Sequence, residues 1–499
     1  MLLTLLLSVF FSVTGQQDFD RLEERIDSVL SAGEREVDVD FAPGTYFFQE
    51  GHLTFSGVQA PDAVLRLHGN GAVLVGAGNG EAPAFENGFV DLEKRKAFDA
   101  LAPVKRCGFW PVRIPFRKGL YFLRCKGEAD VSEADAAGMK LILSQWFVGA
   151  VYDVVKISRG WVYFRRVPYR TRIWSELRFG RCLPRYMLFS PRKAASAYAC
   201  AASNFLCVEN SQIGGIELKG IHFLGNGAGN PLLDIRTLRT DSVKVDSCRF
   251  EGIRSQVVRV DSTNHIRLRN NLFQDCYLGA VRLSPGASDA LVEGNRFIDN
   301  GLQMTNTPIV DCKGQGFVVR GNYFEDFSYC AVGVGLHFTD SAGCITSGVV
   351  EDNEICMTEE FRTGVPRELI DGGTIYIWTQ NKNVVIRHNY IHDIDGPHGN
   401  RGIFADDGAV NVEVSGNLLL NIAGGKDIDL RRAFRVERKR SSVIRRVNVG
   451  NRIEGNVLDG RCRFYVRPDD PTSYKGETIQ LPDGYDRETV VREWKSKQQ

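Results

Sequence analysis

Residues 384–391 read Val-Val-Ile-Arg-His-Asn-Tyr-Ile, and residues 412–419 repeat the pattern as Val-Glu-Val-Ser-Gly-Asn-Leu-Leu. The pattern is an Asn with a large apolar residue two positions later, and a β-rich run precedes most copies. Further copies centre on Asn271, Asn295, Asn322, Asn353 and Asn456. Self-similarity at a spacing of roughly 20–50 residues is typical of a solenoid.

The residue types indicate which solenoid this is. Runs of Val and Ile favour strands over helices. Asn tolerates a left-handed backbone and suits a sharp turn between short strands. Stacked at the strand spacing of about 4.8 Å, such Asn side chains form a hydrogen-bonded ladder. The irregular spacing between copies fits constant coils joined by loops of variable length. The sequence therefore predicts an all-β fold, a right-handed parallel β-helix, and not a leucine-rich repeat, which needs Leu at fixed positions.

Changes in this rhythm predict the domain organisation. We expect a signal peptide over residues 1–15, then a capping helix and the first coils over residues 16–89. Residues 90–204 are rich in aromatic and basic residues and predict an inserted antiparallel β-subdomain. The main β-helix follows over residues 205–466, and residues 467–499 form a tail with a possible closing helix over residues 487–497.

The first fourteen residues are apolar but too short to span a bilayer. They precede Gly15 and two polar Gln residues, as in a secretory signal peptide. No later stretch is long enough to be transmembrane, so we expect a secreted or periplasmic protein and, without evidence for self-association, a monomer.

Charge and cysteine usage narrow the function classes. The chain has 62 basic and 61 acidic residues, so no overall field attracts nucleic acid, which export also disfavours. None of the twelve Cys residues shows the C-x-x-C spacing of a zinc site. Cys248 occupies an Asn position of the repeat and is expected to be buried. The sequence leaves the disulfide pattern open, and we expect no metal site or cofactor.

The densest polar cluster lies on two coils that align at an offset of 28 residues. In this register Tyr376 matches Phe404, and Trp378 matches Asp406. Carboxylates beside an aromatic surface are what cleavage of a glycosidic bond requires. The alternative is ordinary turn chemistry, because Asp-Gly-Gly and Asp-Asp-Gly are common in turns. The candidate catalytic residues are Asp371, Asp406 and Asp407, and the candidate substrate-binding residues are Tyr376, Trp378, His392, Asp395, His398 and Arg401. Asp311, Asp340 and Glu351 on earlier coils could line the same groove, but the favoured interpretation is that they are solvated loop charges.

The segments 371–376, 389–394, 402–408 and 416–417 together resemble right-handed β-helix glycoside hydrolases of families 141 and 120. The resemblance implies activity on plant cell-wall glycans, with Asp371 and one of Asp406 or Asp407 as the carboxylate pair. It also implies an early helix interrupted by a β-subdomain.

A basic run from Lys426 to Arg446 follows this cluster, with nine Lys or Arg residues against three acids. Arginine binds carboxylates bidentately, so the polymer could be uronate-containing; the alternative is a solvated loop. The leading hypothesis is a glycoside hydrolase acting on a polysaccharide or oligosaccharide. One alternative is a polysaccharide lyase, which would use Lys or Arg as base and could need Ca²⁺. The other is a non-catalytic glycan-binding or surface β-helix.

Overall fold

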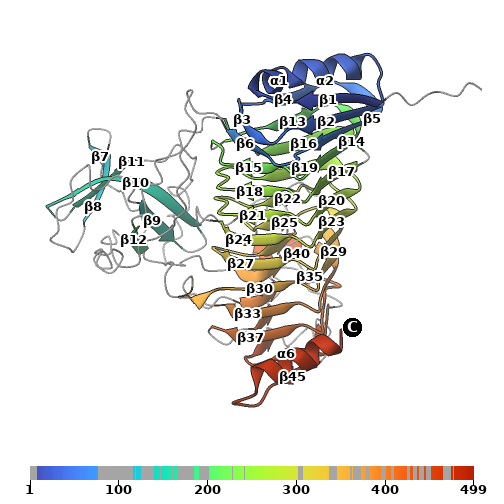
Figure 1. Cartoon of the computed structure of the whole chain (residues 1–499). Helices are drawn as coiled ribbons and strands as arrows, with labels where there is room; N and C mark the ends of the chain where they lie inside the picture. Colours follow the sequence, from blue (N-terminus) through green and yellow to red (C-terminus); the bar gives the residue numbers. More distant parts are fainter. Residues whose placement is uncertain are drawn as a thin grey trace, which may run out of the picture.

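The computed structural model describes the solenoid over residues 8–76, 202–227, 229–240, 242–301, 307–335, 346–359, 362, 372–377, 381–394, 401–405, 409–423, 427–430, 435–437, 443–445, 451–464, 474–475 and 477–498. It also describes six strands between residues 116 and 189. The chain winds into a solenoid whose successive coils add parallel strands to three long faces (Figure 1). We call these faces sheets A, B and C, in the order in which each coil visits them.

Sheet A contains β1 (Ser8–Val13), β2 (Glu36–Phe41), β5 (Gln59–His68), β14 (Gln212–Lys219), β17 (Ser242–Asp246), β20 (Ile266–Arg269), β23 (Ala290–Glu293), β26 (Gln315–Arg320), β29 (Thr346–Glu351), β32 (Asn381–Arg387), β35 (Ala409–Val410), β36 (Glu413–Ser415), β41 (Asn451–Glu454) and β44 (Tyr474–Lys475).

Sheet B contains β3 (Gly44–Phe48), β6 (Ala72–Gly76), β15 (His222–Leu224), β18 (Arg249–Glu251), β21 (Leu272–Gln274), β24 (Arg296–Asn300), β27 (Tyr323–Phe327), β30 (Glu354–Cys356), β33 (Tyr390–Ile394), β37 (Leu418–Ile422), β42 (Asn456–Leu458) and β45 (Thr478–Gln480).

Sheet C contains β4 (Leu53–Ser56), β13 (Leu206–Glu209), β16 (Leu233–Thr240), β19 (Val258–Thr263), β22 (Val281–Leu283), β25 (Val310–Cys312), β28 (Val332–Val334), β31 (Gly373–Ile377), β34 (Arg401–Ala405), β38 (Ile428–Leu430) and β43 (Cys462–Phe464).

The repeated Asn residues form the expected ladder at the turn from sheet A to sheet B. The Asn322 side chain is typical: its amide nitrogen donates to Asn353 Oδ1 at 2.9 Å and to Val292 O at 2.9 Å. Its own oxygen accepts from the backbone and the side chain of Asn295 at 2.9 and 3.0 Å. Cys248 stands in the first position of this row, buried, with its backbone N–H bonded to Asn271 Oδ1, as the sequence predicts.

The residues two positions after each Asn point inward and form the core. Phe250, Phe273, Phe297 and Phe324 stack ring on ring along sheet B, with centroids 4.6–4.9 Å apart. That distance matches the strand spacing, because identical positions on neighbouring coils are one strand apart. The inner core is therefore a set of parallel residue columns running the length of the solenoid.

Helices close both ends of the solenoid (Figure 1). At the N-terminal end α1 (Gln16–Asp20) and α2 (Leu22–Ser31) bury the predicted apolar positions Phe19, Leu22, Ile26 and Leu30. At the other end α6 (Arg487–Ser496) covers the last coils, with Trp494 buried against them. The tail also adds β44 and β45 to the solenoid, so the coils extend beyond the predicted limit at residue 466.

The segment that we interpret as a signal peptide contains a strand. β1 pairs in parallel with β2 over six residues, Val13 is fully buried, and Tyr46 Oη donates to Val13 O at 3.1 Å. The apolar character of this segment therefore has a second explanation, as the outermost strand of sheet A. The signal peptide stays a prediction. No helix in the described part of the chain is long and apolar enough to cross a membrane.

An antiparallel sheet is inserted between β6 and β13, as expected, and projects from the side of the solenoid (Figure 1). Its strands are β7 (Phe116–Arg117), β8 (Leu120–Arg124), β9 (Lys140–Gln145), β10 (Val148–Ser158), β11 (Trp161–Arg165) and β12 (Arg185–Phe189). A short antiparallel pair, β39 (Arg435–Glu437) and β40 (Val443–Arg445), lies within the basic run.

Six cysteines on the described part of the solenoid, Cys207, Cys248, Cys276, Cys312, Cys330 and Cys356, form no disulfide. Burial raises the pKa of Cys248 to about 12 and that of Cys356 to about 11, so these thiols stay protonated. They pack as small apolar residues.

We predict that Asn322→Ala lowers the free energy of unfolding by roughly 2–4 kcal/mol, because it leaves buried donors of Asn295 without their acceptor. Urea denaturation followed by circular dichroism measures the loss. The matched control is Asn264→Ala, on an exposed loop, expected to change stability by less than about 0.5 kcal/mol. An equal loss in both variants would contradict a special role for the ladder.

Candidate functional site

The outward positions of sheet C hold the candidate site. In a strand alternate side chains point to opposite faces, so each strand of this sheet presents one or two residues outward. The pairing places Asp311, Gly333, Tyr376 and Phe404 in register on four neighbouring strands, β25, β28, β31 and β34. The backbone of Asp429 on β38 continues this row. Neighbouring members are about 4.8 Å apart.

The predicted substrate-binding residues Tyr376 and Arg401 both contact Phe404, although Arg401 pairs with Gly373 and is not itself a member of this row. The Tyr376 and Phe404 rings stack with centroids 4.9 Å apart and an interplanar angle of 3°. The Arg401 guanidinium lies 4.0 Å from the Phe404 ring centroid, and its Nη1 donates to Gly372 O at 3.2 Å. Tyr329 meets Tyr376 edge-on at 6.2 Å. The result is a fixed aromatic cluster with a cation stacked on it.

Charged residues extend the row toward the middle of the solenoid. Asp311 is only 4% exposed, and both Arg282 Nε and Lys313 Nζ lie 3.9 Å from its Oδ2. The interpretation of Asp311 as a solvated loop charge is therefore wrong. Burying these ions costs desolvation energy that their mutual attraction offsets only in part. Glu351, by contrast, lies on sheet A and pairs with Arg387 at 2.7 Å.

A second buried carboxylate lies further along the same face. Asp234 on β16 is 2% exposed, and Arg259 Nε donates to its Oδ1 at 2.7 Å while Arg236 Nε donates to its Oδ2 at 3.1 Å. Asp234 was not among the residues predicted from the sequence, although the alternation of apolar and charged residues over residues 233–236 places Asp234 and Arg236 on the outward face.

The predicted 28-residue register of β31 and β34 is confirmed: Ile375 pairs with Ile403, and Ile377 with Ala405. Trp378 and Asp406 directly follow these paired strands in sequence. Both lie outside the described residues, as do Asp371, Asp407, Asp395 and His398. Their placement, and that of Asp340, stays a prediction.

Strand β31 constrains the proposed carboxylate pair. Asp371 precedes it, whereas Asp406 follows the neighbouring β34, so the two join opposite edges of sheet C. The four steps from Gly373 to Ile377 span about 13 Å. Two carboxyl groups attached at those edges approach each other only if the loops that carry them turn over the outer face.

His392 lies elsewhere, on β33 of sheet B. Its Nδ1 is 2.8 Å from Asp393 Oδ2 and 2.9 Å from Arg487 Nη2, and its ring stacks on Tyr390 at 4.2 Å. These contacts fasten α6 to the solenoid. The structure does not bring His392 together with Tyr376 and Arg401.

Asp427 is a further residue that the sequence reading counted only as part of the basic run. It is fully buried directly before β38; its backbone O accepts from Ile403 N at 2.8 Å, and its Oδ2 accepts from Gly460 N at 2.9 Å. Burial, with a smaller contribution from Asp459, raises its pKa to about 7. The side chain holds the turn next to the strand that carries Arg401. The side chains of the basic run after Asp427 and Ile428 lie outside the described residues, up to Arg446.

Comparisons with known proteins agree with the fold. Residues 200–360 match the family described as right handed beta helix region, and the whole solenoid is a right-handed parallel β-helix. Comparison with curated proteins finds no match. In the described part of the chain, no group of three or more His, Cys, Asp or Glu residues is arranged to hold a metal ion.

Similar solved structures include a glycoside hydrolase, with a TM-score of 0.47 and 13% identity over 90% of this chain and 96% of that one. The complex of XylC with xylose has a TM-score of 0.41 and 8% identity over 90% and 75% of the two chains. PfbA, a surface adhesin of Streptococcus pneumoniae, has a TM-score of 0.41 and 12% identity over 93% and 85%. Likenesses this distant carry no inference about activity.

We predict that stability falls as the pH rises toward 7, in part because of Asp427. Its pKa is about 7 in the folded protein and about 3.9 when unfolded, so between these values the folded state holds the extra proton. Asn keeps the acceptor for Gly460 N without the charge. Asp427→Asn should therefore raise the free energy of unfolding by roughly 2–3 kcal/mol more at pH 8 than at pH 5, since part of the cost of the raised pKa is already present at pH 5.

Urea denaturation at pH 5, 6, 7 and 8 tests this expectation, with the exposed Asp483→Asn as the matched control. If the free energy of unfolding changes with pH in the same way for Asp427→Asn and for the unaltered protein, the Asp427 carboxyl is ionised in the folded protein over this whole pH range, and the prediction is wrong.

Proposed function

We propose that the protein is a secreted carbohydrate-active enzyme that binds an extended polysaccharide along the outer face of sheet C and hydrolyses a glycosidic bond. The observation that carries the proposal is the cluster of Tyr376, Phe404 and Arg401 on two strands that directly adjoin the candidate carboxylates in sequence. These three side chains are buried, at 6%, 0% and 5% exposure, so in this proposal the cluster holds the adjoining carboxylates in place for a sugar substrate and is not itself the surface that the sugar contacts.

The shape of the face favours a polymer over a small molecule. Outward residues repeat at about 4.8 Å along the solenoid, so a linear chain that follows the axis meets a new set of side chains at every coil. The row along this face runs from charged residues on β16, β19, β22 and β25 to aromatic residues on β31 and β34. Within it Arg259 and Arg282 are 30% and 43% exposed, and their guanidinium groups would meet the hydroxyl groups of a sugar.

Hydrolysis needs two carboxyl groups, about 5–5.5 Å apart for retention or 6.5–9.5 Å for inversion of the anomeric centre. In this proposal Asp406 or Asp407 supplies one of them, since both follow β34, the strand that carries Arg401 and Phe404. Asp371 supplies the other from the opposite edge of sheet C. One acts as general acid, and its partner acts as nucleophile or as base.

Lys313 supports a second candidate, a polysaccharide lyase. Its side chain is 8% exposed, and it follows β25 in register with Gly335 after β28. In sequence, Trp378 and Asp406 come one position after Ile377 and Ala405, the last residues that the pairing of β31 and β34 describes. A lyase needs a base that removes the proton beside a uronate carboxyl, and Lys313 is a described residue of that type near the cluster.

We predict that incubation with a panel of neutral and uronate-containing polysaccharides releases new reducing ends without ultraviolet absorbance from unsaturated sugars. The single variant Asp371→Asn should lower the rate at least about 100-fold, because it removes an acid or base. One of the single variants Asp406→Asn and Asp407→Asn should do the same.

The matched control is Asp62→Asn, whose carboxylate is 73% exposed near the N-terminal cap. Ultraviolet-absorbing products that disappear in Lys313→Gln would identify the lyase instead. If polysaccharides bind but no product forms, and if binding is unchanged in all the Asp variants, the protein is a non-catalytic glycan-binding protein.

A further inference from the structure

The C-terminal helix α6 is fastened at both ends to the outer face of sheet B. At its start Arg487 Nη1 and Nη2 donate to the two carboxylate oxygens of Asp393 at 3.0 and 2.6 Å, and Nη2 also donates to Tyr390 Oη at 3.1 Å. These bonds hold the pKa of Asp393 well below its usual range, although burial opposes the shift. Near its end Trp494 Nε1 donates to Gly416 O at 2.9 Å.

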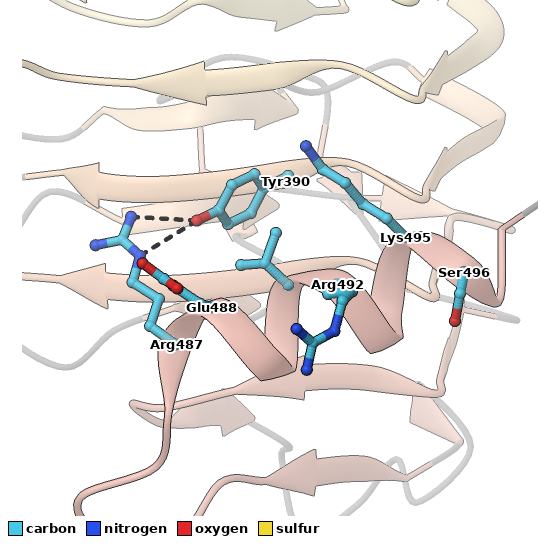
Figure 2. A pocket seen from close by; sticks show the side chains of 7 residues that line it. Tyr390, Arg487, Glu488, Arg492, Lys495 and Ser496 are labelled. Atoms are coloured by element: carbon cyan, nitrogen blue, oxygen red, sulfur yellow. Dashed lines mark hydrogen bonds between the residues drawn. The ribbon is translucent and has the colours of Figure 1, made fainter.

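Between the two attachments the helix and the sheet leave a cavity of about 780 Å³, lined by Tyr390, Arg487, Glu488, Val491, Arg492, Lys495 and Ser496. Figure 2 shows the Tyr390 ring beside the helix, with Arg487 and Glu488 toward one end of the helix and Lys495 and Ser496 toward the other; Val491 also lines the cavity. The volume falls within the range of roughly 300–1,000 Å³ typical of small-ligand sites, but the cavity is widely open to solvent, and six of its seven lining residues lie on α6. Because both ends of α6 are bonded to the solenoid, the cavity is formed before any ligand arrives.

The polar lining is cationic. Three of the lining side chains are basic and one, Glu488, is acidic. Arg487 is neutralised by Asp393, but Arg492 is exposed, bonds Thr489 Oγ1 at 3.1 Å, and has no acid within ion-pair distance in the described part of the chain. Lys495 is 54% exposed, 3.6 Å from Glu354 Oε2. Two cations thus remain accessible at the rim.

These features suit a ligand with an apolar face, hydroxyl groups and one carboxylate. The apolar face would pack on Val491, because Tyr390 is only 6% exposed, with His392 stacked on its ring and Lys495 Nζ 5.7 Å from the ring centroid. The carboxylate would pair with Arg492 and Lys495, and Glu488 and Ser496 would form hydrogen bonds with hydroxyls. A uronate sugar has all three features. A cavity that holds one sugar unit is too small for a nucleic acid, whose binding needs basic residues along many phosphates.

We propose that this cavity is a second, non-catalytic binding site for a uronate unit of an acidic saccharide, on a different face from the sheet C site. The identity of the ligand as a saccharide rests on the proposed function; the carboxylate selectivity rests on the cavity alone. Such a site would hold an acidic polymer at the C-terminal end of the solenoid while another stretch of it lies along sheet C.

The test is isothermal titration calorimetry of the whole protein with a trimer of galacturonate and with its methyl ester, in which an uncharged methyl ester replaces each carboxylate. The acid form should bind, and the ester should bind at least tenfold more weakly. Arg492→Gln should also weaken binding of the acid form about tenfold. Lys497→Gln, which removes the same charge from the same end of the chain outside the cavity lining, should leave it unchanged.

Equal binding of acid and ester, equal losses in the two variants, or no binding at all would each overturn the proposal. If inorganic sulfate at the same concentration competes with the trimer, the cavity is a general anion site, and the proposal is overturned as well. The Asp406→Asn variant separates the two proposals. Trimer binding that this variant keeps and Arg492→Gln loses supports the cavity, even if no polysaccharide is hydrolysed.

Discussion

The buried row of Asn amides at the turn from sheet A to sheet B is the constraint on which the other rows depend. Each amide bonds the neighbouring coils on both sides, as Asn389 does with Val350 O and Asn417 Oδ1. A buried amide without its partner costs about 1–3 kcal/mol, so coils that slip against each other lose a bond at every step. A slip by one residue would also turn every inward side chain outward. The Asn row thereby fixes which residues of sheet C face outward, including Tyr376 and Phe404.

Much of this arrangement is predictable from the sequence because its cause is local and periodic. The spacing of Asn389 and Asn417 gives the register that pairs Tyr376 with Phe404, and the Asn pattern gives the buried position of Cys248. The partners of His392 were not predictable, because Arg487 lies 95 residues away in sequence, on a helix whose docking position no repeat encodes. Asp427 was missed for a related reason. Its burial depends on Gly460 in the next coil, beyond a loop that breaks the repeat.

The outer face of sheet C differs from an ordinary solvated β-surface. Asp234, Asp311 and Arg401 point away from the solenoid interior and are nevertheless almost fully buried. Exposed ion pairs such as those along sheet A form at little cost, whereas buried ions lose hydration that only close partners replace. Residues held in this way have little freedom to rearrange. A rigid set of charges and rings is what orientation of a substrate demands, and the same set makes the face intolerant of substitution.

The docking of α6 has a consequence for how the protein is made. Leu418 and Leu420 point outward from β37 and are fully buried together with Trp494. While the chain is being translated, those leucines have left the ribosome long before Trp494 is added. The nascent chain therefore presents an apolar patch of the kind that chaperones and proteases recognise until α6 emerges. Termination before Trp494 would leave that patch open permanently, so the addition of α6 is itself a checkpoint for quality control.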